Sequence, residues 1–96
     1  MYASVRRYDG VNDVREVTRR VNEGFIQIVR EIPGFVDYYC IDAGGGVVVS
    51  VSVFQDRASA EESNTRAANY VRENLASVLP NLPQITAGEV VAHTAK

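Results

Sequence analysis

The chain of 96 residues, 46% of them hydrophobic, is long enough for one domain with one core. Its formal charge of −2 comes from 12 acidic and 10 basic side chains, which excludes the net basic field that nucleic-acid binding uses. Its single cysteine, Cys40, excludes an intrachain disulfide and a cysteine-based zinc site, and no apolar run approaches the roughly 20 residues that a membrane span needs.

A first strand is predicted over Tyr2 to Tyr8, because polar and apolar side chains alternate there and an Asp-Gly turn dipeptide follows. We assign Ala3 and Val5 to the side that faces the helices. This assignment leaves Ser4 and Arg6 pointing the other way.

The period then changes to that of a helix over about residues 12 to 31, which ends at Pro33-Gly34. Asn12 or Asp13 can cap its first turn. Gly24 inside this helix indicates close packing on the sheet. The apolar stripe of this helix consists of Val14, Val17, Val21, Phe25, Ile28, Val29 and Ile32.

A β-hairpin is predicted over Phe35 to Gln55, with its turn at Gly44-Gly45-Gly46. In its second strand valine recurs at every second position from Val47 to Val53, so one face is aliphatic. The other face carries Val48, Ser50, Ser52 and Phe54. Small hydroxyls beside one aromatic suit a ligand cavity or a subunit interface better than a dry core.

A second helix is predicted from Asp56, with a buried stripe formed by Ala60, Ala67, Val71, Leu75 and Val78. Pro80 and Pro83 end it, and a last strand follows over Gln84 to Thr94. The alternation in that strand leaves open which face is buried. The resulting βαββαβ order predicts one ferredoxin-like α+β domain over residues 1–96, with a four-stranded antiparallel sheet and both helices on one face.

In three stretches the chain resembles the antibiotic biosynthesis monooxygenase-like family: Ile32-Pro33-Gly34-Phe35, Val53-Phe54-Gln55-Asp56 and Ala58-Ser59-Ala60-Glu61. The resemblance implies a homodimeric α/β barrel with a cavity between sheet and helices or at the barrel mouth. It also implies that Val36, Tyr38 and Cys40 face the helices, with Asp37, Tyr39 and Ile41 opposite.

The best-known members of that family oxidise polyaromatic substrates with O₂ and without a cofactor, and others degrade haem. Haem-degrading relatives carry an Asn in the first strand, a Trp in the second helix and a His near the end of that helix. This chain has no Trp, no Asn in its first strand, and its only histidine in the last strand. Haem degradation is therefore disfavoured, and we predict no cofactor and no metal.

Few polar side chains are candidates for such chemistry. His93 is a candidate base and Arg6 a candidate partner for a substrate anion, so both are candidate catalytic residues. Each has a plainer alternative: a frayed, exposed imidazole near the carboxyl terminus for His93, and an ion pair across a dimer interface for Arg6. The candidate ligand-binding residues are Ser4, Tyr39, Ser50, Ser52 and Phe54.

We therefore expect a cytoplasmic homodimer that binds a small apolar or aromatic molecule, with cofactor-independent monooxygenation as its candidate activity. Nucleic acid and membrane are not expected partners. Two alternatives remain open: a non-enzymatic small-molecule-binding or stress-related structural dimer, and a free-standing regulatory domain of the ACT kind.

Overall fold

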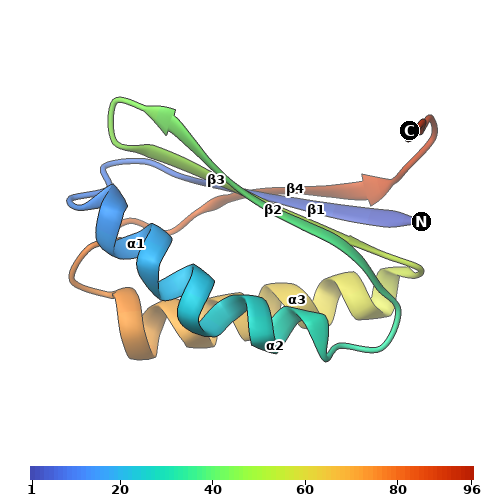
Figure 1. The fold of residues 1–96 in the computed structure, drawn as a ribbon, viewed down its shortest axis with the longest axis horizontal. Helices are drawn as coiled ribbons and strands as arrows, with labels where there is room; N and C mark the ends of the chain where they lie inside the picture. The colour runs from blue at the N-terminus through green and yellow to red at the C-terminus, as the bar shows by residue number, and fades with distance from the viewer.

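The computed structural model describes residues 1–96 as a four-stranded antiparallel sheet with helices on one face only (Figure 1). The strands are β1 (Tyr2–Tyr8), β2 (Phe35–Gly44), β3 (Val47–Phe54) and β4 (Gln84–Glu89). Their spatial order is β2-β3-β1-β4, which is the ferredoxin-like arrangement. The predicted α+β fold and its βαββαβ order are confirmed.

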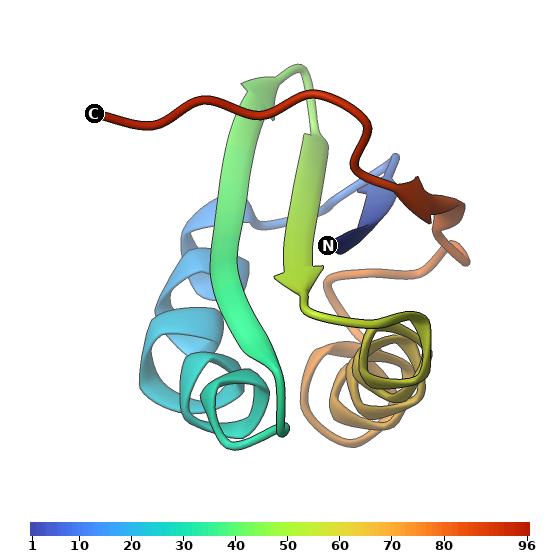
Figure 2. The same ribbon diagram turned by 90° about the vertical axis from the view of Figure 1, so that its right-hand side faces the viewer.

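Two helical arms cover the sheet and lie side by side beneath it (Figure 2). The first arm comprises α1 (Val14–Arg20), a π-helical turn η1 (Val21–Phe25) and α2 (Ile26–Arg30). The second comprises α3 (Arg57–Tyr70) and a π-helical turn η2 (Val71–Leu75). Neither arm is long and apolar enough to cross a bilayer.

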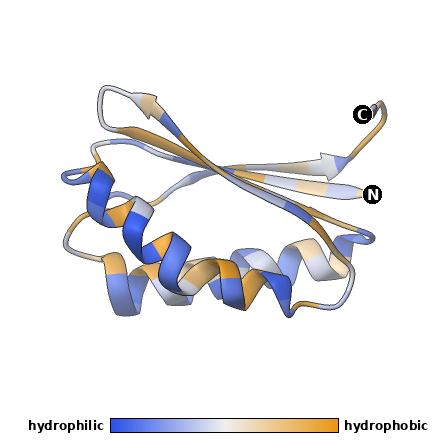
Figure 3. Cartoon of the chain, in the orientation of Figure 1, coloured by the Kyte–Doolittle hydropathy of each residue, from blue (hydrophilic) through white to orange (hydrophobic).

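Each arm begins at an aspartate that caps its first turn. The Asp13 carboxylate accepts a hydrogen bond from the Glu16 amide at 3.1 Å, and the Asp56 carboxylate accepts one from the Ser59 amide at 2.8 Å. Such caps satisfy amides that have no partner within the helix. Hydrophilic and hydrophobic bands alternate along both arms, as expected of helices with one buried side (Figure 3).

The two faces of the sheet are the reverse of the sequence prediction for β1. Ser4 and Arg6 are buried beneath the helices, whereas Ala3 and Val5 lie on the open side, so the assignment of Ala3 and Val5 to the helices is wrong. The register explains this arrangement, because Ser4 pairs with Ser52 and therefore shares its face. The aliphatic face of β3 is the open one, and its hydroxyl face meets the helices.

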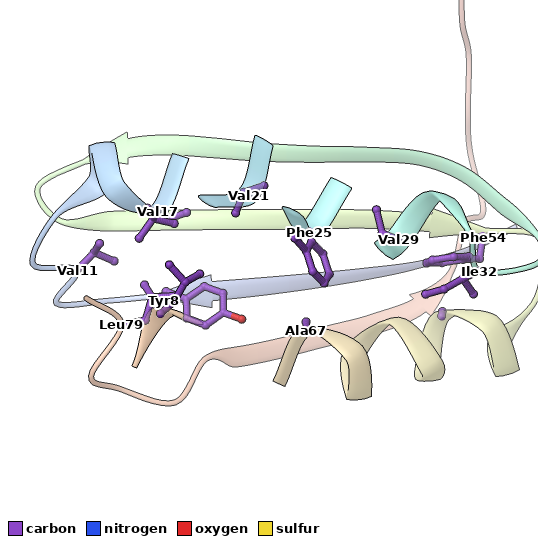
Figure 4. Close-up of a cluster of buried hydrophobic side chains, with 13 residues drawn as sticks. Tyr8, Val11, Val17, Val21, Phe25, Val29, Ile32, Phe54, Ala67 and Leu79 are labelled. Atoms are coloured by element: carbon purple, nitrogen blue, oxygen red, sulfur yellow. The ribbon is translucent and has the colours of Figure 1, made fainter. Parts of the chain in front are cut away.

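The core lies between the sheet and the two arms (Figure 4). At one end Phe54 is fully buried, with its ring centroid 5.8 Å from that of Phe35. Near the middle, the Phe25 ring projects from the first arm, and its centroid is 5.5 Å from that of Tyr38. The core is therefore aromatic at both places and leaves the centre of the sheet to polar side chains.

The two arms are in close contact at Gly24. A Cβ atom at this position would overlap the Tyr70 hydroxyl, so Gly24 packs against the other helix. The sequence interpretation, which had Gly24 packing on the sheet, is wrong. The last strand is also shorter than predicted, since it ends at Glu89. Glu89 pairs with Tyr2 at the start of β1, and beyond it the Val90 amide still donates to the Met1 carbonyl at 2.9 Å.

Candidate functional site

A buried arginine lies at the centre of the helix-covered face. Arg6 is 1% exposed and sits on β1, between β3 and β4. Its Nη1 donates to Asn64 Oδ1 at 2.7 Å, and its Nη2 donates to Ser50 Oγ at 2.9 Å and to Ser52 Oγ at 2.8 Å. Three neutral side chains thus hold the guanidinium in one orientation.

Further hydrogen bonds extend this arrangement. Ser4 Oγ donates to Asn64 Oδ1 at 2.7 Å, and Ser50 Oγ donates to the Tyr38 hydroxyl at 2.9 Å. The Arg6 Cζ atom lies 6.0 Å from the centroid of the Phe25 ring, at the outer limit of a cation–π contact. We call the six hydrogen-bonded residues the Arg6 cluster: Ser4, Arg6, Tyr38, Ser50, Ser52 and Asn64.

The positive charge of the Arg6 cluster has no counter-charge. None of the ion pairs of the structure includes Arg6, and its Nε is buried without a hydrogen-bond partner. Burial lowers the pKa of Arg6, but a guanidinium keeps its proton in a folded protein. Within the cluster, the charged guanidinium of Arg6 is therefore surrounded only by neutral hydrogen-bonding groups.

The titratable side chains around Arg6 are uncharged at neutral pH. Burial raises the pKa of Tyr38 to about 12 and also raises the pKa of Tyr8, and partial desolvation raises the pKa of the more exposed Cys40, despite the opposing effect of the nearby guanidinium. None of the three supplies an anion to Arg6 under ordinary conditions. The charge of Arg6 is therefore left without a compensating anion from these side chains.

Arg6 borders a small cavity between the sheet and the arms, which we call the inner cavity. Its volume is about 30 Å³, which is enough for one or two water molecules. The walls are mainly apolar and include the aromatic rings of Phe25, Tyr38 and Tyr70. Ligand-binding pockets are commonly lined by apolar and aromatic side chains, with a few polar or charged groups that orient the ligand.

A second hollow, the side cleft, lies between the first arm and β2 and is about 230 Å³ in volume. It shares four wall residues with the inner cavity: Val21, Tyr38, Cys40 and Val48. Thr18, Asn22 and Asp42 supply its polar residues. The side cleft therefore adjoins the inner cavity on the side of the first arm and β2.

Both π-helical turns contribute to the inner cavity. Val21 and Phe25 of η1 and Val71 and Leu75 of η2 are all among its walls. A π turn rotates the side chains that follow it and is found frequently at functional sites. Sequence periodicity alone predicts ordinary α-helix here and does not reveal these turns.

The structure brings together some of the predicted site residues and separates others. Arg6, Ser4, Ser50 and Ser52 form one hydrogen-bonded group. Phe54 shares their face but is packed into the core away from the inner cavity.

Two further candidates lie elsewhere. Tyr39 is 56% exposed on the open face of the sheet, because strand alternation places it opposite Tyr38, as the resemblance implied. His93 is exposed and lies beyond the end of β4. Neither side chain therefore meets Arg6 within one subunit.

Asn64 is not among the candidate residues named from the sequence, because bonding at the surface or to the local backbone is the plainer expectation for an asparagine on this helix. It accepts hydrogen bonds from both Ser4 and Arg6. It lies four residues after Ala60 and three before Ala67, which places it on the buried stripe of α3. A polar residue at such a stripe position was the available signal.

No family model matches this sequence, and no curated protein matches it. The monooxygenase from the gene ActVA-Orf6 of Streptomyces coelicolor, solved in complex with Nanaomycin D, is similar with a TM-score of 0.75 and 18% identity, over 99% of this chain and 91% of that one. NE2512, a protein of unknown function from Nitrosomonas europaea, is similar with a TM-score of 0.76 and 16% identity, over 99% of this chain and 93% of that one. An antibiotic biosynthesis monooxygenase of known structure is similar with a TM-score of 0.70 and 13% identity, over 96% of this chain and 100% of that one. The predicted resemblance to antibiotic biosynthesis monooxygenase-like proteins is thus confirmed in the fold.

Proposed function

We propose that this chain forms a homodimer through the open face of its sheet and that each subunit binds a small apolar or aromatic molecule beside Arg6. The observation that carries the proposal is the buried, unpaired guanidinium at an apolar cavity. Cations are not buried in this way for stability, since desolvation costs several kcal/mol per ion. Binding of a ligand to the Arg6 guanidinium would explain why a charged side chain is buried at this position.

The open face of the sheet supports the dimer. Its centre is aliphatic, with Val5 of β1 beside Val49, Val51 and Val53 of β3. On β2 the large side chains of Tyr39 and Ile41 are 56% and 46% exposed. A continuous apolar sheet surface of this kind is typically covered by another layer, and a second copy of the chain supplies a matching one.

The candidate reaction is cofactor-independent monooxygenation of an electron-rich phenol or enol. One atom of O₂ enters the substrate and the other leaves as water, with the electrons supplied by the substrate as it becomes a quinone or ketone. Arg6 would stabilise the phenolate or enolate that reacts with O₂, and the apolar walls would keep water away. His93 stays a candidate base, whose part in turnover only substitution tests.

The competing function is binding without chemistry, by a small-molecule carrier or a stress-related structural dimer. The small volume of the inner cavity, about 30 Å³, favours it, because a polyaromatic substrate would have to open the side cleft. We propose a cytoplasmic location for either function. The formal charge of −2 gives no support for binding to nucleic acid or to an anionic membrane.

Oxygen consumption separates the two functions. We expect the purified protein to consume O₂ with 1-naphthol or a dihydroxynaphthalene as substrate, and Arg6→Gln to reduce the rate at least tenfold. The oxygenase proposal fails if no phenol of this set raises oxygen uptake above the uncatalysed rate. If Arg6→Gln and His93→Ala leave a detected turnover unchanged, the assignment of these two residues is wrong.

A further inference from the structure

We infer that the ligand is a monoanion whose oxyanion binds the free Nε–H of Arg6, with its apolar body along the side cleft. This inference rests on the proposed binding of a small molecule beside Arg6. It extends the anionic charge already proposed for an oxygenase substrate to any ligand of this site, and it adds the atom of Arg6 that receives the oxyanion and the direction from which the ligand enters.

The hydrogen-bond pattern of Arg6 leaves one defined donor free. Nη1 and Nη2 are engaged by Asn64, Ser50 and Ser52, whereas Nε is buried and has no partner. A buried side-chain donor without an acceptor is uncommon in folded proteins, where the large majority of such groups are satisfied. Arg6 is one of the residues that border the inner cavity, so a ligand oxygen that enters the cavity meets the side chain that carries this donor.

Charge decides between a neutral and an anionic oxygen. Every acceptor around the guanidinium is an amide or hydroxyl oxygen, and each is already fixed in a hydrogen bond. A carboxylate or phenolate oxygen would compensate the cation as well as accept its hydrogen bond, and such charge-assisted bonds are about twice as strong as neutral ones. An anionic ligand is therefore selected over its neutral counterpart of the same shape.

No charged group of the chain already fills this role. Tyr8, Tyr38 and Cys40, the titratable groups nearest Arg6, stay protonated near neutral pH. Asp42 is the one carboxylate of the side cleft, and its Oδ1 accepts the Gly44 amide at 2.9 Å in the hairpin. Its negative charge at the cleft disfavours a ligand with a second anionic group at its far end.

The side cleft matches an apolar body that carries one polar end. Val14, Val21 and Ile26 form its apolar side along the first arm, and it adjoins the inner cavity through walls that both share. The inner cavity admits only a small group. The carboxylate or phenolate therefore enters first, and the rest of the molecule stays in the side cleft.

The test compares two probes of similar shape that differ in charge at pH 7.5: 2-naphthoate, which is an anion, and 2-naphthamide, which is neutral. We expect naphthoate to bind the wild-type protein at least tenfold more tightly by isothermal titration, and Arg6→Gln to bring the ratio of the two Kd values close to one. Arg7→Gln is the matched control, since Arg7 is exposed on the open face and ion-paired with Asp9. It should keep the wild-type ratio.

A measurement on the wild-type protein covers the case in which Arg6→Gln does not fold. In a ¹⁵N-arginine NMR spectrum the Arg6 Nε–H signal should shift with naphthoate and stay in place with naphthamide. Equal binding of both probes, or an unmoved Nε–H signal with bound naphthoate, overturns the inference and leaves the proposed binding function standing. If neither probe binds nor any oxygen uptake is found, the inference and the proposed function fall together.

Discussion

The hydroxyl of Tyr70 donates a hydrogen bond to the carbonyl oxygen of Arg20 at 2.7 Å, and this bond joins the second helical arm to the start of the π turn in the first. The same hydroxyl occupies the space where Gly24 lacks a side chain. Tyr70 also borders the inner cavity. The contact that holds the arms together thus fixes one wall of the candidate site.

We predict that Gly24→Ala destabilises the protein by about 1 to 3 kcal/mol, because overpacking outweighs the roughly 1 kcal/mol gained when alanine replaces glycine in a helix. Urea unfolding at a fixed protein concentration measures the change. In a Tyr70→Phe background the cost should fall by at least about 0.5 kcal/mol, since the clashing oxygen is gone. Additive effects of the two substitutions would show that the contact is not tight.

Asn64→Ala should cost about 1 to 3 kcal/mol of unfolding free energy, because it leaves Ser4 and a buried guanidinium without their common acceptor. Chemical denaturation of the variant tests this value. The matched control is Asn74→Ala on the same arm, where the amide is exposed and bonds only to the Tyr70 carbonyl. It should change stability by less than about 0.5 kcal/mol. Equal effects at both positions would mean that the Arg6 cluster contributes nothing to stability.

The fold could be predicted from the sequence because its signals are local and periodic. Alternation over Tyr2–Tyr8, helical spacing from Val14 onward and the triple glycine each act within one element. The faces of β1 could not be predicted in this way. Arg6 reads as an outward residue by its charge, and only the three oxygen acceptors from β3 and α3 allow it to be buried.

The candidate site was predictable only in part for the same reason. Ser50 and Ser52 stood out as hydroxyls on one face of a strand, but their partner was not apparent. The bond from Arg6 to Asn64 spans 58 positions of sequence, and no short-range pattern reports such a contact. His93 was assigned to a strand that ends before it, because strand length depends on the partner strand and not on alternation alone.

Val51→Arg should convert the proposed dimer to a monomer. Val51 lies at the centre of the open face, between Val5 and Tyr39, so an arginine there would bury an uncompensated charge in the interface. Sedimentation equilibrium measures the mass of the wild type and the variant. Ala58→Arg, on the exposed side of α3, is the control and should sediment like the wild type. A wild type that sediments as a stable monomer rules out the dimeric barrel.

The stability of the fold should fall in alkali because of Tyr38. Burial raises its pKa in the folded protein to about 12, above the ordinary tyrosine pKa of about 10 that applies to the unfolded chain. The unfolded state therefore loses its proton first, and stability that is complete below pH 10 declines as the pH rises toward 12. The two-unit difference corresponds to a loss of about 2 to 3 kcal/mol by the end of that range.

Urea unfolding between pH 8 and 11 measures this decline, and Tyr38→Phe is the comparison. The variant lacks the hydroxyl that accepts a hydrogen bond from Ser50, so it should be less stable than the wild type at pH 8. Its stability should then decrease less steeply with pH above pH 10, because the tyrosine whose pKa is raised to about 12 has been removed. The pKa values of the buried Tyr8 and of the partly desolvated Cys40 are raised as well, so a residual slope is expected in the variant. Parallel curves for the two proteins would show that the Tyr38 hydroxyl is not shielded from water, and the inner cavity would then be open.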